Sequence, residues 1–277
     1  MNTEKRHIIV HVHIFKNGGT TFDYALEKNF GEGFVDHRDD QQMRQGKMEY
    51  LLKYLRDNPR VVAISSHVIH FPLVSQDEFE FIPVYFLRHP IERVRSVYTF
   101  ECKQSPEISL GAKMANSLSY EEYMQWRLGE SSPPAIRNIQ TIFLSGMSAG
   151  SKAMDEKFQS AQATLNSNAL IGIVDRYDES MIVFETQLKK VFPDIDLSYI
   201  RQNITDKEPE MVVDMKVRRV LDSLNEEMQE KLIKANEMDM ALYRGSIEKL
   251  EHFLSTLDSN DRLTDFKNRC NSLFEKR

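Results

Sequence analysis

Short runs of apolar, β-branched residues alternate with amphipathic segments along the first two thirds of the chain. The spacing of apolar residues at 48–55, for example, is helical. The apolar runs are typical of buried strands, at residues 7–14, 60–65, 82–87 and 170–174. Strands that alternate with helices predict parallel βαβ units, and therefore an α/β fold with a central parallel sheet flanked by helices.

Further helices and two loops complete this pattern. Helical spacing predicts helices at 20–29, 119–128, 155–165, 180–191 and 216–257, the last with a break near Gly245. The polar, glycine-containing stretches 31–46 and 145–153 predict loops, and we expect the second to be mobile. No linker rich in Pro, Gly or Ser divides the chain. We therefore expect one domain over 1–277, with a core at about 7–200 and a helical carboxyl-terminal part at about 210–277.

Composition narrows the class of protein. Of the 277 residues, 41% are hydrophobic, but no apolar run approaches the roughly 20 residues of a membrane span. Residues 1–6 are polar and include no apolar signal segment. The two cysteines, Cys102 and Cys270, form neither a disulfide framework nor a metal-binding motif. We expect a cytoplasmic protein, unless the chain is a truncated lumenal domain.

The formal net charge of −6 restricts the partners. Proteins that bind long nucleic acids without specificity usually carry a basic surplus, so this class is disfavoured. A small anionic ligand stays compatible, because a local cluster of donors can outweigh the overall sign. The sequence does not indicate an oligomeric state.

A glycine-containing loop follows the first predicted strand and opens a helix. Lys16 supplies a positive charge, two glycines allow the backbone to approach a ligand, and two threonines supply hydroxyls, in Lys16-Asn17-Gly18-Gly19-Thr20-Thr21. Free N–H groups at the helix start favour an anion. In a Walker A loop the lysine follows the glycines, so a magnesium–nucleoside triphosphate is not the expected ligand.

A second element has the same placement after the third predicted strand. Arg88 ends that strand, and Ser96 lies about two helical turns further on. Arginine offers a forked donor that suits phosphate, and serine adds a hydroxyl. Because ligands bind at the carboxyl ends of parallel strands, a second phosphate, separate from the first, could be bound here.

These two motifs resemble the donor-binding elements of sulfotransferases that use 3′-phosphoadenosine 5′-phosphosulfate (PAPS). The branch that is most similar contains carbohydrate 2-O-sulfotransferases of the uronyl and heparan type and their bacterial relatives. Further similar segments are 137–141, 143–146, 172–180, 236–239 and 242–243. The resemblance implies a single-domain fold of the P-loop nucleoside-kinase type, with PAPS as donor, 3′,5′-adenosine bisphosphate as product and no metal.

The resemblance also implies roles for individual residues. Arg88 and Ser96 would hold the 3′-phosphate, and Lys16 would act on the leaving oxygen. The 5′-phosphate would be held by the loop, through Lys16, Asn17, Gly18, Gly19, Thr20 and Thr21. The chain departs from the family at Phe15 and Asn17, where Pro and Thr are usual. We expect Asn17 to preserve binding, because asparagine is polar and tolerates positive φ. The carboxyl-terminal glycine-rich motif of cytosolic small-molecule sulfotransferases is missing, which leaves the acceptor open.

A histidine after the second strand is the expected general base. His67 matches the catalytic histidine of the related carbohydrate branch, and an imidazole can accept a proton near neutral pH. His70 and a carboxylate near Asp36 are the alternatives. His11 and His13 share a strand face and with these two histidines could suggest zinc, but no completing ligand is evident and the motif is disfavoured.

The expected function is transfer of the sulfuryl group from PAPS to a hydroxyl of a carbohydrate or small polar metabolite. The alternatives are a nucleotide-dependent phosphotransferase and a non-catalytic nucleotide-binding protein of the same fold. Two interpretations stay open for Arg93, Arg95 and Arg137, since each could be solvated or could line the site. Arg218 and Arg219 are typical of a solvated helix face.

Overall fold

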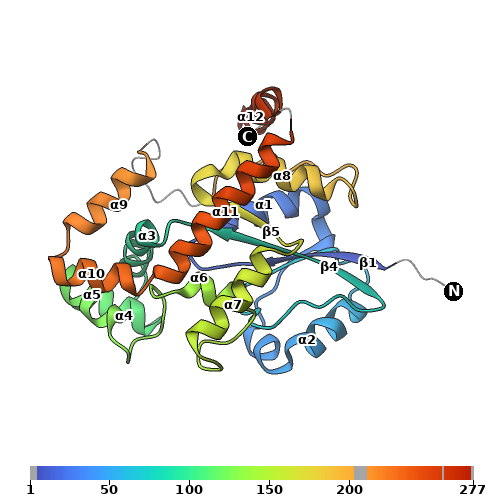
Figure 1. Cartoon of the computed structure of the whole chain (residues 1–277). Helices are drawn as coiled ribbons and strands as arrows, with labels where there is room; N and C mark the ends of the chain where they lie inside the picture. The colour runs from blue at the N-terminus through green and yellow to red at the C-terminus, as the bar shows by residue number, and fades with distance from the viewer. Residues whose placement is uncertain (1–4, 203–210, 258, 276–277) are drawn as a thin grey trace.

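The computed structural model describes residues 5–202, 211–257 and 259–275. One parallel sheet forms its centre (Figure 1). Its strands are β1 (Arg6–Val12), β2 (Phe34–Asp36), β3 (Ala63–Ser66), β4 (Phe79–Leu87) and β5 (Leu170–Ile173). They lie in the order β2-β3-β1-β4-β5, with Ile9 opposite Ala63 on one side and Ile82 on the other. The predicted α/β fold is confirmed. β2 was not expected, because its three residues are too few to show a pattern.

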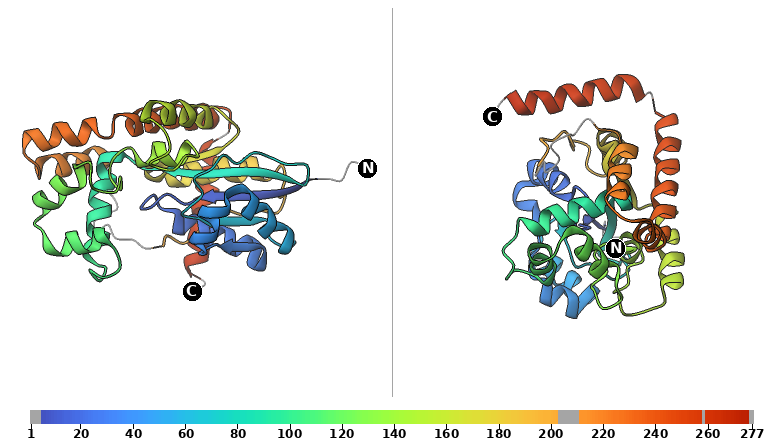
Figure 2. Two further views of the ribbon diagram at one scale, coloured as in Figure 1. Left: turned by 90° about the horizontal axis from the view of Figure 1, so that it is seen from below. Right: turned by 90° about the vertical axis from the view of Figure 1, so that its left-hand side faces the viewer.

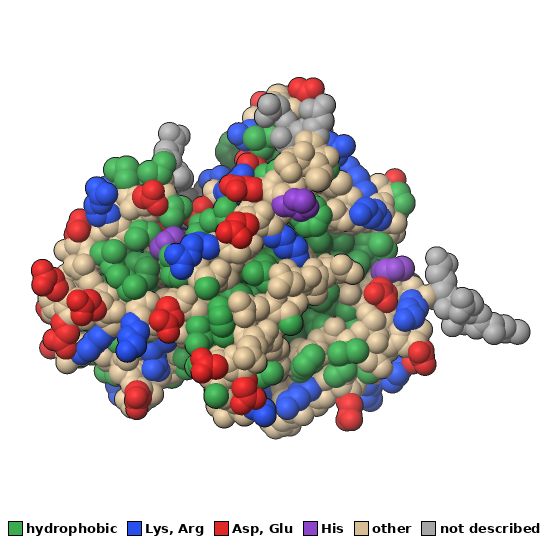
Figure 3. Space-filling model, viewed as in Figure 1, with side chains coloured by type: hydrophobic (Ala, Val, Ile, Leu, Met, Phe, Trp, Pro, Cys, Tyr) green, Lys and Arg blue, Asp and Glu red, His purple; other side chains and the backbone are tan. Residues whose placement is uncertain are grey.

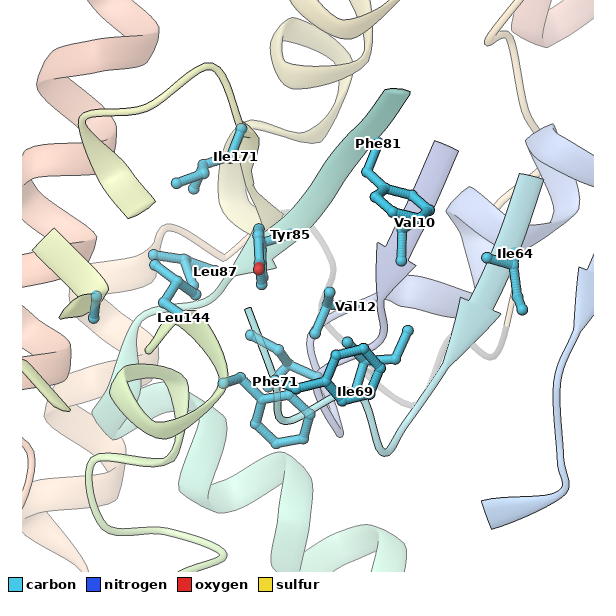
Figure 4. Close-up of a cluster of buried hydrophobic side chains, with 14 of the residues drawn as sticks. Val10, Val12, Ile64, Ile69, Phe71, Phe81, Tyr85, Leu87, Leu144 and Ile171 are labelled. Carbon is cyan, nitrogen blue, oxygen red and sulfur yellow. The ribbon is translucent and has the colours of Figure 1, made fainter. Parts of the chain in front are cut away.

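Helices cover both faces of the sheet. One face is covered by α2 (Asp40–Asp57), α6 (Ile139–Leu144), α7 (Met154–Leu165) and α11 (Glu237–Ser255). The opposite face is covered by α1 (Gly19–Phe30), α8 (Tyr177–Leu188) and α12 (Ser259–Glu275). Side chains alternate along β1, so Val10 and Val12 enter the first core and Ile9 the second. Figure 4 shows the first core around Val10, Val12 and Tyr85.

A helical lobe extends beyond the carboxyl edge of the sheet, on the left of Figure 1. It consists of α3 (Pro90–Cys102), α4 (Leu110–Ser117), α5 (Tyr120–Leu128), α9 (Val213–Asp222) and α10 (Glu226–Lys234). Its own apolar core includes Val94, Tyr123 and Val220. Because α3 starts three residues after β4 ends, the lobe stands beside the edge where parallel sheets bind ligands.

Several predicted boundaries are corrected. The carboxyl-terminal helical stretch breaks after α9 and after α10, whereas α11 continues through Gly245. A Cβ at Gly245 would lie 3.0 Å from Leu165, so this glycine serves the close approach of α11 to α7. The expected loop 31–46 contains β2, the short helix η1 (Gly31–Gly33) and the first turns of α2. α2 is kinked at Lys47, where φ is 47°.

Among the described residues, no helix is both long and apolar enough to cross a membrane. Figure 2 shows α12 turning away from the end of α11, and α12 packs against α8. On the face shown in Figure 3, acidic and basic side chains are interspersed.

Candidate functional site

The loop between β1 and α1 turns sharply at the carboxyl edge of the sheet. Lys16 and Gly18 have φ of 64° and 70°, in the left-handed region that glycine adopts readily and lysine does not. Asn17 does not have the positive φ that we considered for it. Its backbone N–H donates to the Ile14 carbonyl at 3.2 Å. The N–H groups that the loop presents to a ligand therefore begin at Gly18, the N-cap residue of α1.

The side chain of Asn17 points into the protein and fixes the loop. Its Nδ2 donates to the Phe86 carbonyl at 2.6 Å and to Gln140 Oε1 at 2.7 Å. Its Oδ1 accepts from Arg93 Nε at 3.0 Å. The residue that departs from the family pattern thus acts as an internal anchor.

Arg93 holds the same loop from α3. Its guanidinium donates to the Phe15 carbonyl at 3.1 and 3.0 Å and to the Ala135 carbonyl at 2.8 Å. Only 2% of Arg93 is exposed, and burial lowers its pKa to about 10. Arg93 therefore neither faces solvent nor lines the cleft described below. Sequence reasoning had left its role open.

Arg88 brings the second motif to the loop. Its Nη1 donates to the Lys16 carbonyl at 3.1 Å, and the rest of its guanidinium pairs with Glu92. Arg88 and Ser96 line a cleft of about 720 Å³ between α3 and α9. The Ser96 Oγ is buried and has no hydrogen-bond partner within the described part of the chain. The structure thus brings together the two motifs that the sequence analysis paired.

Lys16 is held in a strongly cationic environment. Its Nζ lies 4.6 Å from the centroid of the Phe100 ring, on α3. Burial, followed by the charges of Arg88, Lys103 and Arg93, lowers the pKa of Lys16 to about 8. Crowded cations raise each other's energy, and a bound anion would relieve this repulsion. The arrangement favours an anionic ligand at the loop.

The threonines of the loop differ in their surroundings. Thr20 is exposed at the start of α1. Thr21 is buried, and its hydroxyl accepts from the Gln202 backbone N–H at 3.1 Å. Tyr177 reaches the same loop, because its hydroxyl donates to the Gly18 carbonyl at 3.1 Å. This contact explains one part of the 172–180 segment that resembles the family.

His67 follows β3 and lies beside the loop. Its Nδ1 donates to the His13 carbonyl at 2.8 Å, and the two rings have centroids 4.0 Å apart. With the proton on Nδ1, Nε2 carries the lone pair that a general base needs. Burial, and next the charge of His13, lowers the pKa of His67 to about 4, so the imidazole is neutral at pH 7.

Asp23 on α1 completes this cluster and was missed in the sequence. Its carboxylate lies 2.6 Å from His11 Nδ1 and 3.0 Å from His13 Nδ1. Burial would raise its pKa, but the histidine pair, His11 foremost, holds the pKa well below its usual range. The three side chains could offer ligand atoms to a metal ion. Both Nδ1 atoms already face the carboxylate, His11 in a hydrogen bond and His13 in an ion-pair contact. The signal in the sequence that could have identified Asp23 is its charge, since it lies among apolar positions of α1.

A polar network links the remaining family-like segments to the site. Gln140 accepts from the Arg88 backbone N–H at 2.9 Å and donates to the Arg88 carbonyl at 3.0 Å. Asp239, which is buried, accepts from the N–H groups of Gln140 at 3.0 Å and Thr141 at 2.7 Å. Asn236 donates to the Ile136 carbonyl at 2.8 Å. These segments support the strand end that carries Arg88.

The remaining candidate residues, His70, Asp36 and Arg137, have their contacts elsewhere in the structure. The ring centroids of His70 and Phe143 lie 4.4 Å apart with the planes tilted by 52°, and burial lowers the pKa of His70 to about 4. Asp36 ends β2 and pairs with Arg38 at 2.5 Å on the surface. Arg137 donates to the Ser132 carbonyl and does not line the cleft.

Comparison with known proteins shows to which family this chain belongs. A model of the sulfotransferase family matches residues 1–244. The chain belongs to this family. It is also 29% identical over 247 residues to an uncharacterized protein from Archaeoglobus fulgidus, across 88% of this chain and 97% of that one. The central parallel sheet agrees with the sulfotransferase fold, and membership supports sulfuryl transfer.

Proposed function

We propose that this sulfotransferase uses PAPS as its donor. The observation that carries the proposal is the position of Arg88, which contacts the loop through the Lys16 carbonyl and lines, with Ser96, the cleft beside it. The loop offers backbone N–H groups and a lysine to the 5′-phosphosulfate. Ser96 and the free N–H groups of Arg88 suit the 3′-phosphate. A second phosphate, bound apart from the loop, distinguishes this donor from an ordinary adenine nucleotide.

The chemistry follows from the positions of the side chains. An acceptor oxygen forms a bond to sulfur while the bond from sulfur to the bridging oxygen of the 5′-phosphate breaks. Negative charge grows on that phosphate, where Lys16 and the start of α1 stabilise it. His67 Nε2 accepts the proton of the acceptor hydroxyl. The negative charge of Asp23, which lies 3.0 Å from His13 Nδ1, acts to raise the pKa of His67 and so favours the imidazolium that forms.

The acceptor in this proposal is a hydroxyl on a carbohydrate or a small polar metabolite. His67 is favoured over His70 because its Nδ1–H is held by the His13 carbonyl, whereas His70 Nδ1 is buried without a hydrogen-bond partner among the described residues. Asp36 is disfavoured because it is exposed and paired with Arg38. No metal is needed for these steps.

Calorimetry with two nucleotides tests the donor. The protein should bind 3′,5′-adenosine bisphosphate at least tenfold more tightly than 5′-AMP, since a charge-assisted phosphate contact contributes about 1.5–3 kcal/mol. Ser96→Ala should reduce this preference. Equal affinity for both nucleotides would contradict the proposal, and magnesium-dependent ATP hydrolysis would point to a phosphotransferase instead.

Transfer of labelled sulfur from PAPS to a panel of glycans and metabolites tests the reaction. His67→Ala should abolish transfer while donor affinity stays within about twofold, because His67 contacts the acceptor side. His70→Ala is the matched control and should keep most of the activity. Tight donor binding without transfer to any acceptor would favour a non-catalytic protein.

A further inference from the structure

Helix α9 forms a second wall of the donor cleft, opposite α3. Val220 of α9 is buried in the lobe core, together with Val94 and Val97 of α3. The two helices lie side by side, as Figures 1 and 2 also show. Lys216 and Arg219, which are one helical turn apart, line the cleft. Ser96 of α3 lines the same cleft.

The cleft has a large positive surplus. Arg88, Arg95 and Lys103 line one wall, and Lys216 and Arg219 line the other. Glu92 is the acidic residue among the lining side chains, and it is paired with Arg88. Such a local surplus in a chain of net charge −6 indicates a ligand that carries more than one negative charge here.

The buried hydroxyl of Ser96 is the second observation. Only 9% of Ser96 is exposed, and its Oγ has no hydrogen-bond partner among the described residues. A buried hydroxyl without a partner costs free energy, which a bound acceptor oxygen would recover. An oxygen that accepts from the Ser96 hydroxyl would therefore lie in the same cleft as the basic side chains.

We propose that Lys216 and Arg219 bind the 3′-phosphate from α9 and give this protein its preference for a 3′-phosphorylated nucleotide. This inference rests on the proposed donor. A nucleotide without the 3′-phosphate engages the loop alone, whereas the bisphosphate also bridges α3 and α9. Arg219, which the sequence suggested to be solvated, is exposed but turned to the cleft, while its neighbour Arg218 is outside the lining.

The double variant Lys216→Gln/Arg219→Gln tests the proposal by calorimetry with 3′,5′-adenosine bisphosphate and 5′-AMP. Affinity for the bisphosphate should fall about tenfold or more, and affinity for 5′-AMP should change less than about threefold. Arg218→Gln is the matched control, because it removes one charge from the same helix outside the cleft. Its affinities should equal those of the unchanged protein. Thermal unfolding establishes that each variant is folded.

The outcomes separate this inference from the proposed function. If the unchanged protein shows no preference for the bisphosphate, both are wrong. If it shows the preference and the double variant keeps it, only the role of α9 is wrong. Equal losses for both nucleotides, or the same loss in Arg218→Gln, would show general electrostatic attraction and would also overturn the role of α9.

Discussion

Two partly buried imidazoles should make the stability of this protein depend on pH. Burial lowers the pKa of both His67 and His70 to about 4 from the ordinary value of 6.5, with smaller contributions from His13 and Arg44 respectively. The folded state then resists the protonation that the unfolded chain undergoes below pH 6.5. The associated stability is complete above pH 6.5 and is lost as the pH falls toward 4.

The magnitude follows from the size of the shift. Moving a pKa from 6.5 to about 4 corresponds to about 3 kcal/mol for a fully buried imidazole. His70 is only partly buried, so we expect about 2 kcal/mol from it. This would be a substantial part of the roughly 5–15 kcal/mol that stabilises a typical protein.

Urea unfolding followed by circular dichroism at several pH values between about 7.5 and 4.5 measures the effect. His70→Gln should flatten the fall in unfolding free energy by about 2 kcal/mol over this range, because glutamine does not titrate. His252→Gln, at an exposed position on α11, is the control and should leave the curve unchanged. If His70→Gln and the unchanged protein lose stability in parallel, the buried imidazole is not the cause.

Three further predictions concern the loop. Arg93→Met should lower the unfolding free energy by about 3–5 kcal/mol in urea, because it leaves three buried acceptors without a donor, and a loss below 1 kcal/mol would contradict this. Adenosine bisphosphate binding should weaken in calorimetry as the pH rises through about 8, where Lys16 loses its charge, and Lys16→Arg should remove this dependence. Gly19→Ala should lower the melting temperature, because its Cβ would lie 2.5 Å from the His13 ring; an unchanged value would show that the ring can move aside.

The elements that follow from local patterns could be predicted from the sequence. Four of the five strands appear as short apolar runs, and α1, α5 and α7 lie within a residue or two of their expected bounds. Placing Lys16 and Arg88 after strands was enough to bring both to one edge, because all strands of the sheet are parallel.

The contacts that hold the site could not be predicted in this way. Asn17 bonds to Arg93, 76 residues away, and to Gln140, 123 residues away. Each of these residues alone is typical of a surface or a loop. Only the packing of α3 and α6 against the end of β4 makes them partners, and no local spacing encodes that packing.

The two adjacent glycines of the loop, Gly18 and Gly19, show most clearly what the sequence pattern does not predict. From the sequence both serve the turn and the approach of a ligand. In the structure only Gly18 has positive φ, whereas the Cβ position of Gly19 is occupied by the rings of His13 and His11. Gly18 therefore shapes the loop, and Gly19 lets α1 pack onto the histidines that Asp23 and His67 contact. Since the same helix start faces the proposed donor phosphate, the absence of a side chain at Gly19 is what allows the proposed anion site and the proposed base to be neighbours.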